Sequence, residues 1–347
     1  MLNYRMVVIF VLLNLVIGLG TGCSSNHQSK DSDGEDKVML FPVKIKDEYG
    51  YVDENYKIVV QAKYDNVNYF SEGLAAVQKN RKWGYIDKRG KVIIPMQYDG
   101  AFRFNEGHAV VVKRNEKGEE NWFVINKKGK KVIETDYYRM SFFSEGLSAV
   151  IFNEGGHTGY INTQGEVVIE TQFKFAGNFN EGLAVVSKNN KWGYIDRLGE
   201  IVVPIIYDDA LAFTEGLAPV KKGELWGFIN KEGHWVTEAE FDDAGQMFEG
   251  LAAVKKDEKW GFVDHQGTLV IPYQYDATRY FSENLAAVLV ENEGWGYIDR
   301  NGKEVIRPIY SEAYNSENGI MLVSKETLFE YEYIDQSGND VVFLEKK

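Results

Sequence analysis

From residue 38 onward, the chain alternates short apolar runs with polar segments that contain Gly, Asn or Asp. In residues 192–196, WGYID, strand geometry places Trp, Tyr and Asp on one face and Gly and Ile on the other. Short alternating runs bounded by such turn residues are typical of β-strands. No window keeps apolar residues at helical spacing over ten positions. The pattern therefore predicts an all-β protein.

The same phrases recur along the chain, which identifies a tandem repeat. Each unit has a run like EGLAAV, a polar turn, a run like KWGYID, a turn closing on glycine, a run like VVIP, and a connector like YDxAxxFxEG. We therefore predict nine tandem β-repeats of about 34 residues over 38–347. One aromatic column marks the units, and its members are Tyr49, Trp83, Trp122, Thr158, Trp192, Trp226, Trp260, Trp295 and Tyr331.

The acidic residue of the YID phrase recurs in most units but does not indicate catalysis. The same column holds Asn126, Asn162 and Asn230. An amide cannot replace a carboxylate in acid–base chemistry, whereas an Asx turn needs only a short acceptor. Glycine follows three residues later in eight units, where a tight hairpin needs a positive φ. These columns predict turns.

The aromatic column has two interpretations, because Trp and Tyr serve both protein cores and binding surfaces. Rings placed once per unit, in register, would pack neighbouring repeats together. An exposed aromatic stripe would instead bind sugar rings. We predict that the repeat-signature residues are structural, and they are Trp83, Trp122, Trp192, Trp226, Trp260 and Trp295.

The first 22 residues differ from the rest of the chain. Arg5 precedes the apolar run MVVIFVLLNLVIGLG, and small residues lead to Cys23, the only cysteine in the sequence. This pattern predicts a secretion signal, since the run is shorter than the roughly 20 residues of a membrane-spanning helix. A transmembrane anchor, or an ordinary signal peptide that leaves a free thiol, is the alternative. Residues 23–37 are polar and charged, which predicts a flexible tether.

The segment around Cys23 resembles the lipobox of bacterial lipoproteins, although Gly20 stands where Leu is usual. The resemblance implies a lipoprotein signal peptide over 1–22, cleavage before Cys23 and acylation of its thiol. Two or more acyl chains hold a protein stably on a membrane. We therefore expect a secreted protein that is lipid-anchored to the cell membrane and faces outside the cytoplasm, in either an inner or an outer membrane.

The repeat phrases resemble the WG-type (KWG) β-repeat of bacterial proteins over 38–347. That resemblance implies a β-rich array used for interaction and scaffolding, with no general catalytic activity. About 34 residues hold three short strands, and nine units exceed the usual four to eight blades of a propeller. We therefore expect an open, curved, solenoid-like array. A closed propeller-like ring is the alternative.

Charge and motif content exclude several function classes. The formal net charge of −13 and the absence of a basic cluster argue against nucleic-acid binding. The five histidines are scattered, and no zinc-binding spacing, phosphate-binding loop, nucleophile elbow or CxxC motif occurs. We therefore expect no enzymatic activity, no metal and no cofactor.

These observations predict a lipid-anchored, non-enzymatic scaffold that binds an envelope protein. The alternative is a module that binds glycan or peptidoglycan through exposed Trp and Tyr rings. Units three and four have longer first hairpin loops, in residues 113–122 and 151–160. Because repeat proteins often bind partners on the face where insertions cluster, we expect a partner there first.

Overall fold

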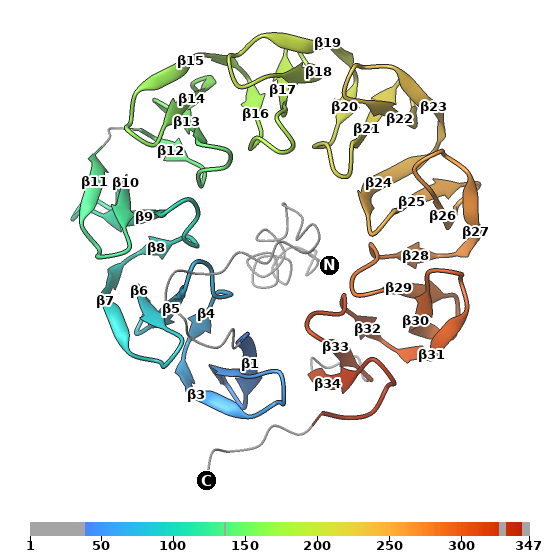
Figure 1. Ribbon diagram of the computed structural model, residues 1–347, viewed down its shortest axis with the longest axis horizontal. Helices are drawn as coiled ribbons and strands as arrows, with labels where there is room; N and C mark the ends of the chain where they lie inside the picture. The colour runs from blue at the N-terminus through green and yellow to red at the C-terminus, as the bar shows by residue number, and fades with distance from the viewer. Residues whose placement is uncertain (1–38, 135–136, 326–330, 342–347) are drawn as a thin grey trace, which may run out of the picture. The chain divides into compact units, whose positions relative to one another are not determined.

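The computed structural model describes residues 39–134, 137–325 and 331–341. The chain divides into two units, Met1–Met39 and Leu40–Lys347. The predicted signal peptide, the tether and Cys23 lie outside the described residues. In the part that is described, no helix is long and apolar enough to cross a bilayer. Within Leu40–Lys347, the strands form nine antiparallel sheets that follow one another around a ring (Figure 1).

We number these sheets I to IX in chain order, and most have four strands. Sheet I contains β1 (Phe41–Ile45), β2 (Glu48–Val52) and β3 (Ile58–Tyr64). Sheet II contains β4 (Asn66–Val67), β5 (Leu74–Lys79), β6 (Lys82–Asp87) and β7 (Val92–Tyr98). Sheet III contains β8 (Gly100–Ala101), β9 (His108–Arg114), β10 (Glu120–Asn126) and β11 (Lys131–Glu134). Sheet IV contains β12 (Arg139–Met140), β13 (Leu147–Ile151), β14 (Thr158–Asn162) and β15 (Val167–Phe173).

The second half of the ring repeats this order. Sheet V contains β16 (Phe175–Ala176), β17 (Ala184–Lys188), β18 (Lys191–Ile195) and β19 (Ile201–Tyr207). Sheet VI contains β20 (Asp209–Ala210), β21 (Leu217–Lys222), β22 (Leu225–Asn230) and β23 (Trp235–Phe241). Sheet VII contains β24 (Asp243–Phe248), β25 (Leu251–Lys256), β26 (Lys259–Val263) and β27 (Leu269–Tyr275). Sheet VIII contains β28 (Ala277–Thr278), β29 (Leu285–Val290), β30 (Gly294–Asp299) and β31 (Glu304–Tyr310), and sheet IX contains β32 (Glu312–Ala313), β33 (Ile320–Ser324) and β34 (Tyr331–Asp335).

The prediction of an all-β repeat array is confirmed, and the structure adds one strand per unit to the three expected. The connector after each long strand forms a short strand that pairs with the next unit. In sheet VI, for example, Asp209 pairs with Lys221 and Ala210 with Val220. This short strand lies on the inner side of the ring, and the long third strand of each repeat lies at the outer rim (Figure 1). The fourth strand fits into about 34 residues because it has only two residues in every sheet that contains it except sheet VII, where β24 has six.

Of the two architectures considered, the structure has the closed ring and not the open array. Tyr333 of β34 packs against a cluster of sheet I that includes Val43 and Ile58. Its hydroxyl lies 3.3 Å from the backbone nitrogen of Lys44. Tyr69, which follows β4, donates a hydrogen bond to Glu317 of sheet IX. Because every unit presents the same kind of aromatic surface, the two ends of the array can pack on each other.

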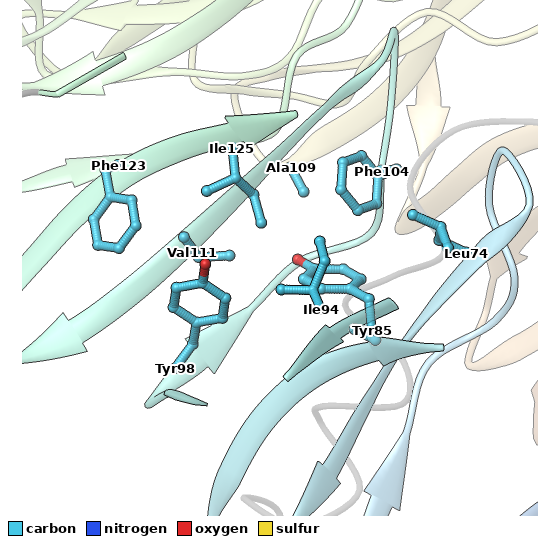
Figure 2. Packing of buried hydrophobic residues seen from close by; sticks show 10 residues of the cluster. Leu74, Tyr85, Ile94, Tyr98, Phe104, Ala109, Val111, Phe123 and Ile125 are labelled. Carbon is cyan, nitrogen blue, oxygen red and sulfur yellow. The ribbon is translucent and has the colours of Figure 1, made fainter. Parts of the chain in front are cut away.

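Each hydrophobic core lies between two consecutive sheets. Figure 2 shows the core shared by sheets II and III, in which side chains of β6 and β7 face those of β9 and β10. Its members are Leu74, Ala76, Tyr85, Ile94, Tyr98, Phe104, Ala109, Val111, Phe123 and Ile125. A sheet therefore leaves apolar surface exposed unless its neighbours are present.

The glycine after each tryptophan is required by a close backbone contact. In sheet V, the pairing between β18 and β19 shifts on both sides of Tyr194, so β19 bulges. A Cβ atom on Gly193 would lie 2.7 Å from backbone atoms of Val203, Pro204 and Ile205. The glycine therefore leaves room for the bulged outer strand.

Sheet III has a different residue at this position. Phe123 replaces the glycine, is buried, and pairs with Glu134 of β11.

We predict that Gly193→Ala lowers the free energy of unfolding by about 3 kcal/mol, because the backbone of β19 must shift to admit a methyl group. Chemical denaturation followed by tryptophan fluorescence measures this change. Gly182→Asn is the control, because nothing lies within 4 Å of the Cβ position at Gly182. Asn also tolerates the positive φ of Gly182. Equal losses for the two variants would contradict the explanation.

Candidate functional site

The turn after each YID phrase is an Asx turn, as the sequence indicated. In sheet V, Oδ1 of Asp196 accepts hydrogen bonds from the backbone N–H groups of Leu198 and Glu200, both at 2.9 Å. Asn126 accepts the equivalent bonds from Lys128 and Lys130. Because Asp and Asn make the same contacts, the carboxylates of this column have a structural role.

A second acidic column links consecutive sheets, and sequence reasoning missed it. Glu181 occupies the first position of a two-residue turn, with a φ of 55°. Its carboxylate accepts a hydrogen bond from the N–H of Gly216 at 3.0 Å and lies 3.0 Å from Nζ of Lys231, both in sheet VI. Asn–Gly is the usual pair in such a turn. The recurrence of Glu in place of Asn was therefore the sequence signal that this residue has another role. Glu72, Glu106, Glu145, Glu215, Glu249 and Glu283 make the corresponding backbone contacts.

A third acidic column joins neighbouring hairpins. Asp208 accepts a hydrogen bond from Nζ of Lys191 at 2.6 Å and another from the N–H of Gly223 at 2.8 Å. These two bonds, first from the lysine and then from the backbone, lower the pKa of the Asp208 carboxyl. Asp99 and Asp276 are held in the same way and also have lowered pKa values.

The tyrosine of the WGYID phrase ties each core to the next sheet. The Tyr194 hydroxyl donates a hydrogen bond to the carbonyl oxygen of Leu211 at 2.7 Å. Burial raises the pKa of Tyr194 well above its ordinary value. Tyr85 and Tyr297 make the same bond to Phe102 and Tyr314. The buried hydroxyl therefore satisfies a backbone carbonyl of the next unit.

The predicted signature tryptophans lie against the cores between sheets. Trp226 is buried, and Trp83, Trp122, Trp192, Trp260 and Trp295 are partly buried. Trp192 packs beside the core between sheets V and VI, and its ring lies 5.2 Å from that of Phe175. Thr158, which replaces tryptophan in sheet IV, is also buried. The column therefore packs against cores and does not form a free-standing exposed stripe.

The longer hairpins of units three and four are well defined at their bases. Nη2 of Arg114 lies 2.9 Å from Oε1 of Glu120 across the unit-three hairpin. In unit four, Phe152 is exposed and its ring lies 4.8 Å from that of Tyr137. Over the described ranges, no three His, Cys, Asp or Glu side chains are grouped as ligands for a metal ion.

A series of exposed apolar side chains follows the outer strands of the ring. We call it the aliphatic rim, and its members are Val92 and Ile93 of β7, Val132 of β11, Val167 and Val168 of β15, Ile201, Val202 and Ile206 of β19, Leu269 and Val270 of β27, and Val305 and Ile309 of β31. All of these residues except Ile206 and Ile309, which follow the proline, belong to the VVIP run. The sequence showed this run as a strand without indicating which side chains would be exposed. Exposed apolar residues that adjoin along one strand, such as Ile201 and Val202, are candidates for an interaction site.

We predict that Glu181→Ala lowers the free energy of unfolding by about 2 kcal/mol, because it removes two charge-assisted contacts between sheets V and VI. Glu106→Ala is the matched variant. Glu106 accepts the N–H of Gly146 at 2.7 Å, but Thr163 occupies the column of Lys231 in sheet IV. Its loss should be about 1 kcal/mol. Chemical denaturation compares the two variants, and a larger loss for Glu106→Ala would contradict the assignment.

The lowered carboxyl pKa values predict acid sensitivity. A carboxyl whose pKa is lower in the folded state stabilises the protein at neutral pH, and this contribution is lost as the pH falls below about 4. The triple variant with Asp99→Asn, Asp208→Asn and Asp276→Asn should therefore lose less stability than the wild type between pH 5 and pH 3, as measured by thermal unfolding. Parallel curves for the two proteins would exclude these carboxyls as a cause.

Comparisons with known proteins agree with the repeat seen in the structure. A family model described as "WG containing repeat" matches residues 49–83, 83–117, 122–154, 159–192, 192–226, 226–260, 260–293 and 295–326. No curated protein matches the chain.

Two of the similar solved structures are a computationally designed protein, Ika8, and BamB from Moraxella catarrhalis. Ika8 is 11% identical, with a TM-score of 0.47 over 80% of this chain and 95% of its own. BamB is 11% identical, with a TM-score of 0.43 over 72% of this chain and 93% of its own. The eight matches to the family model cover most of the chain, and the protein therefore belongs to the WG-repeat family.

Proposed function

We propose that the protein is a non-enzymatic scaffold that binds a protein partner, held at the cell membrane by acyl chains on Cys23 and facing outside the cytoplasm. The aliphatic rim is the observation that carries this proposal. Its side chains are exposed on six of the nine sheets. The same strands also contribute to the cores: in β19, for example, Val203 and Tyr207 are buried.

The polar columns of the repeat support the same conclusion. Glu181, Asp196 and Asp208 are all used in hydrogen bonds within the ring. These carboxylates are engaged within the ring, so we propose that a partner contacts the aliphatic rim. Apolar surface at the centre of a protein interface contributes most of the binding free energy when it is removed from water.

The membrane anchor rests on the sequence around Cys23. The apolar run, the small residues before Cys23 and the absence of a second cysteine all fit acylation of this thiol. A lipid anchor would keep the ring near envelope proteins and so raise the effective concentration of a partner.

A photo-crosslinking amino acid at Ile309, which is exposed on the rim of sheet VIII, tests both parts in intact cells. We expect discrete protein adducts in the membrane fraction. Cys23→Ser should move both the protein and its adducts out of that fraction, because the acyl chains are lost.

The control places the crosslinker at Glu224, whose side chain is exposed in a hairpin away from the rim. Equal adducts from Glu224 and Ile309 would contradict a specific interaction at the rim. A protein that stays on the membrane after Cys23→Ser would contradict the lipid anchor.

A further inference from the structure

Sheet V differs from the other sheets in the turn before its outer strand. The second residue after the Asx position is Leu198 in sheet V, and its side chain is 77% exposed. The other eight units have polar residues in this column, namely Asn55, Arg89, Lys128, Gln164, Glu232, Gln266, Asn301 and Ser337. Because Leu198 is exposed, it does not contribute to a hydrophobic core, and the fold does not require an apolar residue at this position.

The sixth residue of the outer strand repeats this difference. Sheet V has Ile206, which is 58% exposed, and only Ile309 of sheet VIII is also apolar there. The matching residues of the other outer strands described over this position are Lys63, Gln97, Gln172, Glu240 and Gln274. Among the repeats described at both positions, sheet V alone is apolar at both, next to the exposed Ile201 and Val202.

We call Leu198, Ile201, Val202 and Ile206 the sheet V patch. Leu198 lies in the turn before β19, and the other three residues lie on β19 itself, where Ile201 and Ile206 are at most about 17 Å apart at the usual rise per residue of a strand. Pro204, in the middle of β19, lacks an N–H and so interrupts the edge as a template for strand addition. A partner would therefore contact the side chains of the patch and not extend the sheet.

The two sheets next to sheet V carry exposed carboxylates on and beside their outer strands. In sheet IV, Glu166 and Glu170 are exposed on and beside β15. In sheet VI, Glu232 and Glu238 are exposed on and beside β23. An apolar centre between acidic flanks is complementary to a partner with the opposite arrangement.

We propose that the sheet V patch binds a basic amphipathic segment of a partner protein, an inference that rests on the proposed scaffold function. The apolar side chains of that segment cover Leu198 and Ile206, and its Lys or Arg residues lie near Glu170 and Glu238. A membrane surface is less well matched, because the same carboxylates repel anionic lipids.

The probe is a fluorescein-labelled helical peptide of 18 leucine and lysine residues, titrated by anisotropy against the full-length protein in phosphatidylcholine nanodiscs. Empty nanodiscs correct for binding to lipid. We expect the double variant Leu198→Gln/Ile206→Gln to bind this peptide at least tenfold more weakly, because two apolar side chains are lost from the contact. A peptide with glutamate in place of lysine should bind the wild type at least tenfold more weakly.

The fold should tolerate this double variant, because Gln164 and Gln172 occupy both positions in sheet IV, and Gln266 and Gln274 in sheet VII. An unchanged thermal unfolding midpoint checks this. The reverse change, Gln266→Leu/Gln274→Ile, places the same pair beside Leu269 and Val270 in sheet VII and should raise the bound peptide from one to two per ring.

Three outcomes would overturn the proposal. The first is a peptide affinity of the Leu198→Gln/Ile206→Gln variant within twofold of the wild-type affinity, and the second is a single bound peptide in the sheet VII variant. The third is that the wild type binds phosphatidylglycerol vesicles and not the peptide, and that the Leu198→Gln/Ile206→Gln variant loses this vesicle binding. Adducts from Ile309 test the scaffold function separately. If these adducts form although the peptide experiments exclude the sheet V patch, the proposed scaffold function stands and only the sheet V binding site is wrong.

Discussion

Every hydrophobic core of the ring is shared between two consecutive sheets, and the rest of the structure depends on this sharing. Tyr194 and Val203 of sheet V pack with Phe213 and Val220 of sheet VI, so neither sheet buries its apolar face alone. The two end sheets face the same requirement. Tyr333 meets it by packing on sheet I, which explains why nine units close into a ring. A ring leaves no terminal repeat with an exposed apolar face, which an open array would have to cap with polar residues.

Hydrogen bonds from one sheet to the next accompany each shared core. The hydroxyl of Tyr194, the carboxylate of Glu181 and the carboxylate of Asp208 each reach a backbone group of sheet VI. These groups orient neighbouring sheets more narrowly than apolar packing, because hydrogen bonds depend on direction. They also explain how an acidic chain remains compact, since the carboxylates of these columns accept N–H groups or pair with lysine. The residues that hold the ring together are therefore the ones that the repeat keeps similar from unit to unit.

The outer rim follows a different rule. In β7, β11, β15, β19, β27 and β31 the first two strand positions are exposed, so packing does not dictate their side chains. The sixth position is exposed in every outer strand that is described over seven residues. Gln172 of sheet IV, Ile206 of sheet V and Glu240 of sheet VI stand at the same position on the same scaffold. Each sheet can therefore present its own surface chemistry while the ring stays unchanged. Such a division between constant cores and variable rims suits a protein whose function is binding.

The sequence by itself determined the features that depend on residues close together in the chain. Alternating polarity predicts the strands, Asp196 and Gly199 predict the turn between them, and recurrence of these phrases predicts the nine units. Only the tertiary structure decided which residues from different units meet. Closure through Tyr333, the contact of Glu181 with Gly216 and Lys231, and the exposure of both Leu198 and Ile206 all depend on the curvature that each unit adds to the array. That curvature arises from packing between sheets, which a local pattern does not encode.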